Sequence, residues 1–332
     1  MTINNKPLVS FCVKSYNQRK YIAEALDGAF AQTYRPLEIV ISDDCSSDGT
    51  AELIQEKIDE CKMKGITIPV TFNRNKKNLG NLGNWIIFGE LSRGDLLIKA
   101  DGDDISFPER TEKIVEAWER NGRQAKVIQH RGMLIDEEGR DLCGTIGDNG
   151  SCQAYSRDLW TCFPQIAEID RHEKIYDDIE FAVRASALAG ELATLTMPDL
   201  LVKYRFGSGD TTGRKSYRET MTLDWAVLHD SIAHGLEEVA LNMSTLDADV
   251  ANHNCKALEI RMRESHLNLQ LVDARNNWCS RLAAVRELES GFSRNSLRDR
   301  LFHIVFLLPR HLGDALLAPY FKLCYFRRKY SQ

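Results

Sequence analysis

Short apolar segments alternate with segments of helical spacing over the first hundred residues, and this alternation limits the fold more than any other feature. Apolar residues at helical spacing predict helices over 18–32, from about 50 to 64, and within 78–94. Alternation of this kind predicts βαβ units, and therefore a mostly parallel sheet with helices on its faces. The strands are expected in four short runs rich in β-branched, aliphatic and aromatic residues: 8–13, 37–42, 66–75 and 95–100.

The second half of the chain changes character at a stretch rich in Gly, Ser and Thr, 207–213. From about 215 to 290 the chain is nearly free of Pro and Gly and has helical spacing. We therefore expect an α/β domain over 1–212 and a helical C-terminal region over 213–332. Before that boundary the sequence predicts a helix over 109–121, a hairpin over 125–142 with its turn at 137–139, a Gly-rich loop over 144–160, a helix over 176–190 and a last strand over 200–206.

Charge and cysteine content exclude several functional classes. The 332 residues carry a formal net charge of −5, which gives no reason to expect binding to nucleic acid. The nine cysteines are scattered and form no CxxC pair, which argues against zinc and a disulfide framework and favours a reducing compartment. Neither a signal peptide nor a run of about 18 apolar residues is evident. We expect a cytoplasmic protein.

Polar clusters follow three of the predicted strands: KSYN at 14–17, DDCSSDGT at 43–50 and DGDD at 101–104. In open parallel sheets, ligands bind outside the carboxyl ends of the strands. The coincidence of all three clusters at such ends points to a binding site more strongly than any one cluster does.

The DGDD cluster has three readings. A solvated turn with Ser106 capping the next helix is the plain structural one. A helix-loop-helix calcium loop fails, because Ile105 would take its fifth position and Ser106 the position that requires Gly. A Mg²⁺ or Mn²⁺ site for a diphosphate fits better, because these cations favour carboxylate, phosphate and water oxygens.

Two further acid pairs are ambiguous by themselves. In DDCSSDGT, the carboxylates at a strand end either form a turn and helix cap or accept hydrogen bonds from a base or ribose. In YDDIEFAVR, Asp177 and Asp178 suit the first turn of a helix through its dipole, and one of them equally suits a general base for an acceptor hydroxyl.

Taken together, these motifs resemble those of the family-2 inverting glycosyltransferases with the GT-A fold. The similarity covers about 7–210. The opening matches almost throughout, from the apolar strand and its SYN turn through QTY to DD-S-DGT. NLG…N, RGDLLIKADGDD and YDDIEFAVR follow in family order, with Asp177 where Glu is usual. The resemblance implies a Rossmann-like, mostly parallel central sheet with flanking helices, plus a helical C-terminal region.

The resemblance also implies the chemistry. A sugar would pass from a nucleotide-sugar, with UDP the favoured nucleotide, to a hydroxyl of a glycan or lipid-linked saccharide. Asp178 would be the catalytic base, and Asp101 and Asp103 would hold Mn²⁺ or Mg²⁺ at the diphosphate. The nucleotide-sugar would also meet Val13, Ser15, Tyr16, Asp44, Asn78, Asn84 and Gly102. Residues implied nearby are Asp104, Gly150, Ser151, Cys152 and Asp177.

Two positions depart from the family pattern. Related enzymes often have a His after the YR strand, whereas this chain reads Tyr204, Arg205, Phe206. Arg205 or Arg214 could meet the diphosphate in its place. Lys14 stands where a small polar residue is usual, and would either contact the base or point to solvent.

The C-terminal tail, 294–332, combines apolar runs with many basic residues and only Asp299 and Asp314 as acids. Such a segment suits a helix lying in a membrane interface, which would place the protein on the cytoplasmic face of the inner membrane. It equally suits helices packed on the domain or on a second subunit. A lipid-linked acceptor would favour the first reading, and the resemblance implies assembly of a bacterial surface polysaccharide or lipopolysaccharide.

Two rival functions follow from the same residues. A nucleotidyltransferase with a similar sheet would need a Gly-rich loop after the first strand, but KSYNQRKY contains no Gly. A catalytically inactive scaffold is the other rival, and the presence of Asp101, Asp103 and Asp178 argues against it.

Overall fold

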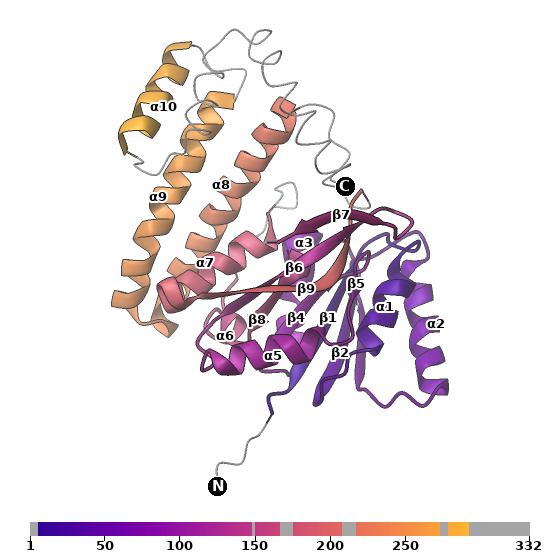
Figure 1. Ribbon diagram of the computed structural model, residues 1–332. Coiled ribbons are helices and arrows are strands. Elements are labelled where there is room, and N and C mark those ends of the chain that lie inside the picture. Colours follow the sequence, from indigo (N-terminus) through magenta and orange to yellow (C-terminus); the bar gives the residue numbers. More distant parts are fainter. Residues whose placement is uncertain (1–5, 148–149, 167–174, 208–216, 273–277, 292–332) are drawn as a thin grey trace.

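The computed structural model describes residues 6–147, 150–166, 175–207, 217–272 and 278–291. Within these residues nine strands form one sheet in the order β3-β2-β1-β4-β8-β6-β9-β5, with β7 paired to β6 (Figure 1). The strands are β1 (Val9–Ser15), β2 (Leu37–Asp43), β3 (Val70–Arg74), β4 (Leu96–Asp101), β5 (Ile105–Ser106), β6 (Val127–Ile135), β7 (Asp141–Ile146), β8 (Gln153–Ser156) and β9 (Thr194–Arg205).

The helices confirm the predicted alternation. Each predicted helix in the α/β part is present, and the segment 78–94 holds two short ones. They are α1 (Ile22–Phe30), α2 (Thr50–Met63), α3 (Gly80–Ile86), α4 (Phe88–Leu91), α5 (Arg110–Arg120), α6 (Asp158–Thr161) and α7 (Asp177–Ala189). The C-terminal helices are α8 (Tyr217–Leu241), α9 (Ala248–Val272) and α10 (Trp278–Gly291). Short 3₁₀ turns are η1 (Gly150–Cys152), η2 (Gly190–Leu192) and η3 (Met243–Thr245).

The sheet is mixed, so the expectation of a mostly parallel sheet holds fully only for its first half. β3, β2, β1 and β4 pair in parallel, and so do β6 and β9. β8 runs antiparallel to both β4 and β6, and β5 and β7 are antiparallel to their partners. β8 falls within the predicted loop 144–160, and Ser106 lies in β5 rather than capping a helix. Short strands that pair with distant segments give little local signal.

Two apolar layers hold the sheet between helices (Figure 1). On one face α1, α2 and α5 pack on alternate strand residues such as Phe11 and Ile98. On the other face α3, α4, α6 and α7 pack on the residues between them, such as Cys12 and Leu97. Because successive side chains of a strand point to opposite faces, Lys14, Lys99 and Asp101 project toward the α3 and α7 side.

The C-terminal helices stand beside α7, with α8 and α9 side by side and α10 against α9 (Figure 1). Their contact with α7 is an apolar cluster that includes Phe163, Val183, Ile232, Val239 and Leu258. The helical C-terminal region is therefore confirmed as far as it is described. The proposed boundary at 212 and 213, and the tail 294–332, lie outside the described residues. No helix in the described part is long and apolar enough to cross a membrane.

Candidate functional site

The three polar clusters meet at one edge of the sheet, as the sequence predicts. β1 lies between β2 and β4, with Ser15 opposite Asp43 and Lys14 opposite Asp101 in the parallel registers. Parallel strands bring their carboxyl ends to the same edge, so acids from β2 and β4 flank the end of β1.

Asp101 is the acid that this edge holds most firmly. Its Oδ2 accepts a hydrogen bond from Ser151 Oγ at 2.6 Å, and its Oδ1 lies 3.4 Å from Lys14 Nζ. Burial opposes the charge of Asp101, but the ammonium groups of Lys14 and Lys99 lower its pKa to about 2. Ser151 is therefore a structural partner of the acid cluster, and Asp101 is ionised at any physiological pH.

Hydrogen bonds between Arg205 and the acid loop, residues 101–104, hold this loop in place. Asp104 is buried, and its Oδ1 accepts a hydrogen bond from the backbone N–H of Arg205 at 2.7 Å. The Arg205 guanidinium donates to the carbonyl oxygens of Asp103, Asp136 and Glu137, and its Nη2 lies 3.0 Å from Glu24. Its side chain is only 1% exposed. The suggested contact between Arg205 and a diphosphate is therefore wrong, because the donors are already used inside the protein. Arg214 lies outside the described residues.

Asp177 is saturated by its neighbours. Its Oδ2 lies 2.5 Å from Lys99 Nζ and 3.2 Å from Lys14 Nζ. Its Oδ1 accepts hydrogen bonds at 3.0 Å from Asn81 Nδ2 and from the backbone N–H of Asp178. Burial is outweighed by the two lysines, which lower the pKa of Asp177. A carboxylate with four partners and a depressed pKa is a poor base, so Asp177 anchors the start of α7.

Asp178 has the opposite character. Its Oδ1 accepts a hydrogen bond from the backbone N–H of Ile179 at 3.0 Å, and its side chain is partly exposed. Burial and the neighbouring charge of Asp177 raise its pKa to about 6. A carboxylate with a pKa near neutrality is suited to accept a proton from a hydroxyl. The contrast between the two acids favours Asp178 as the base, which stays a prediction.

The acid cluster has the donor atoms that a divalent cation requires. Among the described residues, Asp101 Oδ1 and Asp104 Oδ2 are buried oxygens that accept no hydrogen bond. Asp103 lies between them and is half-buried. Burial, together with Asp103 and Asp101, raises the pKa of Asp104 well above its ordinary value, which is the expected behaviour of crowded acids without a cation. These residues therefore fit Mg²⁺ or Mn²⁺.

At the end of β2, Asp44 accepts hydrogen bonds from the loop between β3 and α3. Its Oδ1 accepts from Asn75 Nδ2 and from the backbone N–H of Leu79, and its Oδ2 accepts from the backbone N–H of Gly80, at 2.8–2.9 Å. A carboxylate accepts about four hydrogen bonds, so roughly one position is left for a base. Exposed Asn78 accepts from Gly80 N–H and stabilises the same turn.

The other residues that the resemblance places at the nucleotide differ in how far their side chains are exposed. Tyr16 is 46% exposed at the end of β1 and presents an open ring. The Val13 side chain is fully buried in the apolar core, and Ser15 donates to Asp43. Asn84 is buried and bonded to Ser42 and Asn75, so the structure favours a supporting role for it over the expected direct contact. Cys152 is also buried.

Gly102 explains how the acid loop leaves β4. A Cβ added there would lie 2.5 Å from Gln18 Oε1 and 3.2 Å from the carbonyl oxygen of Lys14. The backbone N–H of Gly102 donates to that carbonyl at 2.8 Å. A glycine at this position therefore lets the ends of β1 and β4 approach each other closely.

Sequence reasoning missed two buried cations at the floor of the site. Lys99 is 1% exposed and pairs with Asp177, and Arg110 is fully buried and donates to the carbonyl oxygens of Lys99 and Ser151 at 2.7 Å. A signal existed for the first: a Lys inside the apolar run DLLIKA is almost never buried without a partner. Both expectations for Lys14 are wrong. It neither points to solvent nor is free to contact a base, because it is paired with Asp101 and Asp177 and donates to Asn81.

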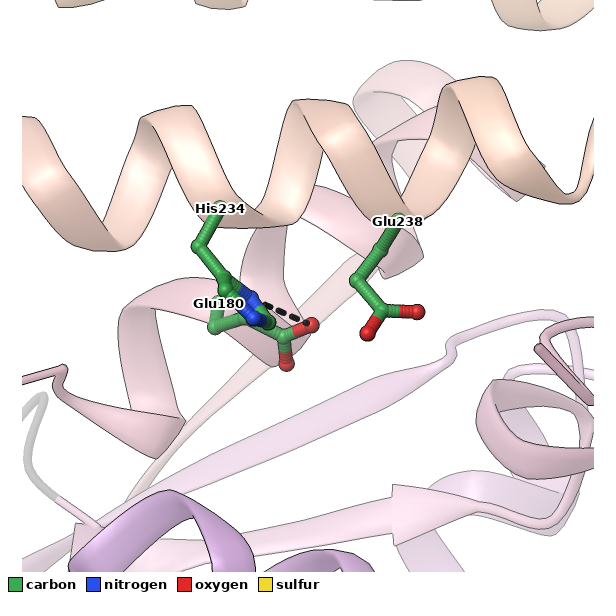
Figure 2. A group of neighbouring side chains, drawn as sticks. All are labelled: Glu180, His234 and Glu238. Carbon is green, nitrogen blue, oxygen red and sulfur yellow. Dashed lines mark ion pairs between the residues drawn. The ribbon is translucent and has the colours of Figure 1, made fainter. Parts of the chain in front are cut away.

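A second buried polar cluster lies between α7 and α8, and its member on α7 is two residues after Asp178. Glu180 projects from α7 toward His234 and Glu238 on α8 (Figure 2). These are ligand types of a metal site, but the Arg184 guanidinium lies 2.7 Å from Glu180 and 3.5 Å from Glu238. Arg184 therefore already supplies one positive charge to the two buried carboxylates, and the raised pKa of Glu180 reduces their negative charge. We interpret the cluster as an ion-pair network that joins α7 to the C-terminal helices.

The network predicts a pH dependence of stability. Burial raises the pKa of Glu180 to about 7, while the unfolded value is near 4.5. The native state therefore binds this proton more tightly, so stability should rise as pH falls from about 7 toward 4.5, by up to about 3 kcal/mol. Urea unfolding at pH 8 and pH 6 checks this, and Glu180→Gln should remove most of the difference. An unchanged slope in that variant would assign the dependence to Asp178 or another acid.

Comparisons with known proteins identify related glycosyltransferases. The family model Glycosyl transferase family 2 matches residues 10–141. An uncharacterized glycosyltransferase of Haemophilus influenzae is 27% identical over 273 residues, which are 74% of this chain and 80% of that protein. The putative glycosyltransferase EpsE of Bacillus subtilis is 31% identical over 41% of this chain and 46% of its own length. The putative teichuronic acid biosynthesis glycosyltransferase TuaG of the same organism is 48% identical over 17% of this chain and 23% of its own length.

Solved structures support the same fold. The mannosyltransferase PcManGT of Pyrobaculum calidifontis, in complex with GDP-Man and Mn²⁺, aligns over 99% of this chain and 83% of its own, with a TM-score of 0.55 and 14% identity. S. aureus TarS in complex with UDP-GlcNAc aligns over 98% and 93%, with a TM-score of 0.52 and 14% identity. The fold is that of the GT-A glycosyltransferases, with a helical C-terminal region.

Proposed function

Because the chain belongs to glycosyltransferase family 2, we propose that it moves a sugar from a nucleotide-sugar to a hydroxyl of a saccharide acceptor, with inversion at the anomeric carbon. The observation that carries the proposal is the pairing of two acid sites. The cluster Asp101, Asp103 and Asp104 fits a cation and a diphosphate, and α7 is tied to it through Asp177. Asp178, whose pKa is raised, directly follows Asp177 at the start of α7.

In the proposed reaction, Asp178 takes the proton of the acceptor hydroxyl. The hydroxyl oxygen forms a bond to the anomeric carbon as the bond from that carbon to the diphosphate oxygen breaks, and the electron pair leaves with the nucleoside diphosphate. Asp177 keeps α7 in place, because Lys14, Lys99 and Asn81 fix its carboxylate. A single base suffices for one displacement with inversion.

Mn²⁺ or Mg²⁺, held by Asp101 and Asp103, would act as a Lewis acid at the diphosphate. The exposed ring of Tyr16 and the remaining acceptor position of Asp44 suit the base of the nucleotide. UDP and GDP are both candidates, since TarS and PcManGT are described with one each. The name of TuaG, which refers to teichuronic acid biosynthesis, supports an acceptor in polysaccharide assembly, and we propose that this acceptor is a glycan or a lipid-linked saccharide.

Thermal unfolding tests donor and metal together. A ligand that binds only the folded state raises its stability by RT ln(1 + [L]/Kd), about 2.7 kcal/mol at 100 times Kd. We expect UDP or GDP to raise the melting temperature more with Mn²⁺ than without it, and Asp103→Ala to lose the Mn²⁺-dependent part. Asp199→Ala, an acid paired with Lys113 on the surface, is the matched control and should keep the full shift. No shift with any nucleotide would favour the inactive scaffold.

A further inference from the structure

Lys14 lies at the centre of the candidate site and contacts two of its acids. Its Nζ is 3.4 Å from Asp101 Oδ1 and 3.2 Å from Asp177 Oδ2, and it donates to Asn81 Oδ1. The side chain is 11% exposed, whereas that of Asp101 is 26% exposed. The ammonium group is thus held against an oxygen that accepts no hydrogen bond and that a divalent cation would use.

Two acids and two lysines of the site are paired with one another before any metal binds. Asp101 and Asp177 carry two negative charges, and Lys14 and Lys99 carry two positive ones within 3.4 Å of them. Asp103 and Asp104 add negative charge on the loop that follows Asp101. A cation that binds Asp101 must therefore share its oxygen with Lys14 and accept a like charge close by.

Resting on the proposed function, we propose that Lys14 is a built-in counter-cation of the acid cluster, which weakens divalent-cation binding to the free protein and makes the cation and the donor diphosphate bind cooperatively. A diphosphate brings negative charge that offsets both the ammonium and the metal. Each ligand then raises the affinity for the other by the same factor, as linkage requires. The metal would be held tightly only when the donor is present.

Lys14 fits this role better than Lys99. Lys99 is 2% exposed in its side chain, lies 5.6 Å from the centroid of the Trp85 ring, and is paired with Asp177 at 2.5 Å. It is enclosed behind the site, and its nearest carboxylate is not one of the expected metal ligands. Lys14 alone of the pair reaches a carboxylate oxygen of Asp101.

The experiment measures Mn²⁺ binding by the loss of the free-ion signal in electron paramagnetic resonance, with and without UDP or GDP, after subtraction of the Mn²⁺ that the nucleotide binds in the absence of protein. In the wild type we expect the nucleotide to tighten Mn²⁺ binding at least about tenfold. In Lys14→Met, Mn²⁺ should bind the free protein at least about tenfold more tightly, and the effect of the nucleotide should shrink. Lys14→Arg keeps the charge and should resemble the wild type, as should Lys113→Met on the surface of α5.

The outcomes are distinct. Equal or weaker Mn²⁺ binding in a folded Lys14→Met protein overturns the role of Lys14 and leaves the proposed function intact. If that variant does not fold, the wild type decides, because Mn²⁺ affinity that ignores the nucleotide also overturns it. Failure of every variant to bind nucleotide with Mn²⁺ contradicts the proposed function as well.

Discussion

Asp178→Asn should lower the rate of sugar transfer by about 10²- to 10⁴-fold while leaving the affinity for the nucleotide nearly unchanged. The substitution removes the group that accepts the hydroxyl proton, and it preserves size and most hydrogen bonding. Because the pKa of Asp178 is raised to about 6, wild-type kcat/KM should be full above that pH and fall as pH drops through it. Residual activity of the variant should lack this acid limb.

Asp177→Asn is the matched control, since it changes the neighbouring acid in the same way. It leaves Lys14 and Lys99 without the carboxylate that they share, so its main effect should be a loss of stability. The pH profile of its remaining activity should keep an acid limb, but at lower pH than in the wild type, because the charge of Asp177 no longer raises the pKa of Asp178. Should Asp178→Asn instead retain more than about a tenth of the wild-type rate, the base lies elsewhere.

The sequence made the first half of the sheet predictable, because β1, β2 and β4 are continuous apolar runs with polar residues at their ends. A short run such as LVSFCV, with β-branched and aromatic members, favours a buried strand, and β1 is one. The same ends carry Asp44 and Asp101, so the edge of the site followed from the strands. Local sequence patterns were sufficient to predict the structure wherever a segment's own apolar residues determine whether it is buried.

The second half depended on contacts between distant segments. β8 has only four residues, and it is a strand because β4 and β6 pair with it on either side. Arg205 is likewise unpredictable from its neighbours, because its partners are the carbonyl oxygens of residues about 70 and 100 positions away. A buried Arg satisfied by backbone groups looks, in sequence, like one that is free for a phosphate.

Removal of a charge from the network between α7 and α8 should give the largest change in stability. Arg184 is 1% exposed and is the cation shared by Glu180 and Glu238, both fully buried. Arg184→Met would leave two buried carboxylates facing each other, and breaking a buried pair in this way costs about 3–5 kcal/mol of unfolding free energy. Urea unfolding at pH 8, where Glu180 is mostly ionised, measures the loss at its fullest.

The control for this prediction is Arg263→Met, which breaks an ion pair with Glu287 of similar length, 2.9 Å, between half-exposed side chains on α9 and α10. Exposed pairs contribute about 0–1 kcal/mol, so the two variants should differ severalfold. Replacing Arg184, Glu180 and Glu238 together by Met and Leu should recover most of the loss, since no unpaired charge is then buried. Equal losses for Arg184→Met and Arg263→Met would mean that the network is solvated, and α7 would then be held to the C-terminal helices by apolar packing alone.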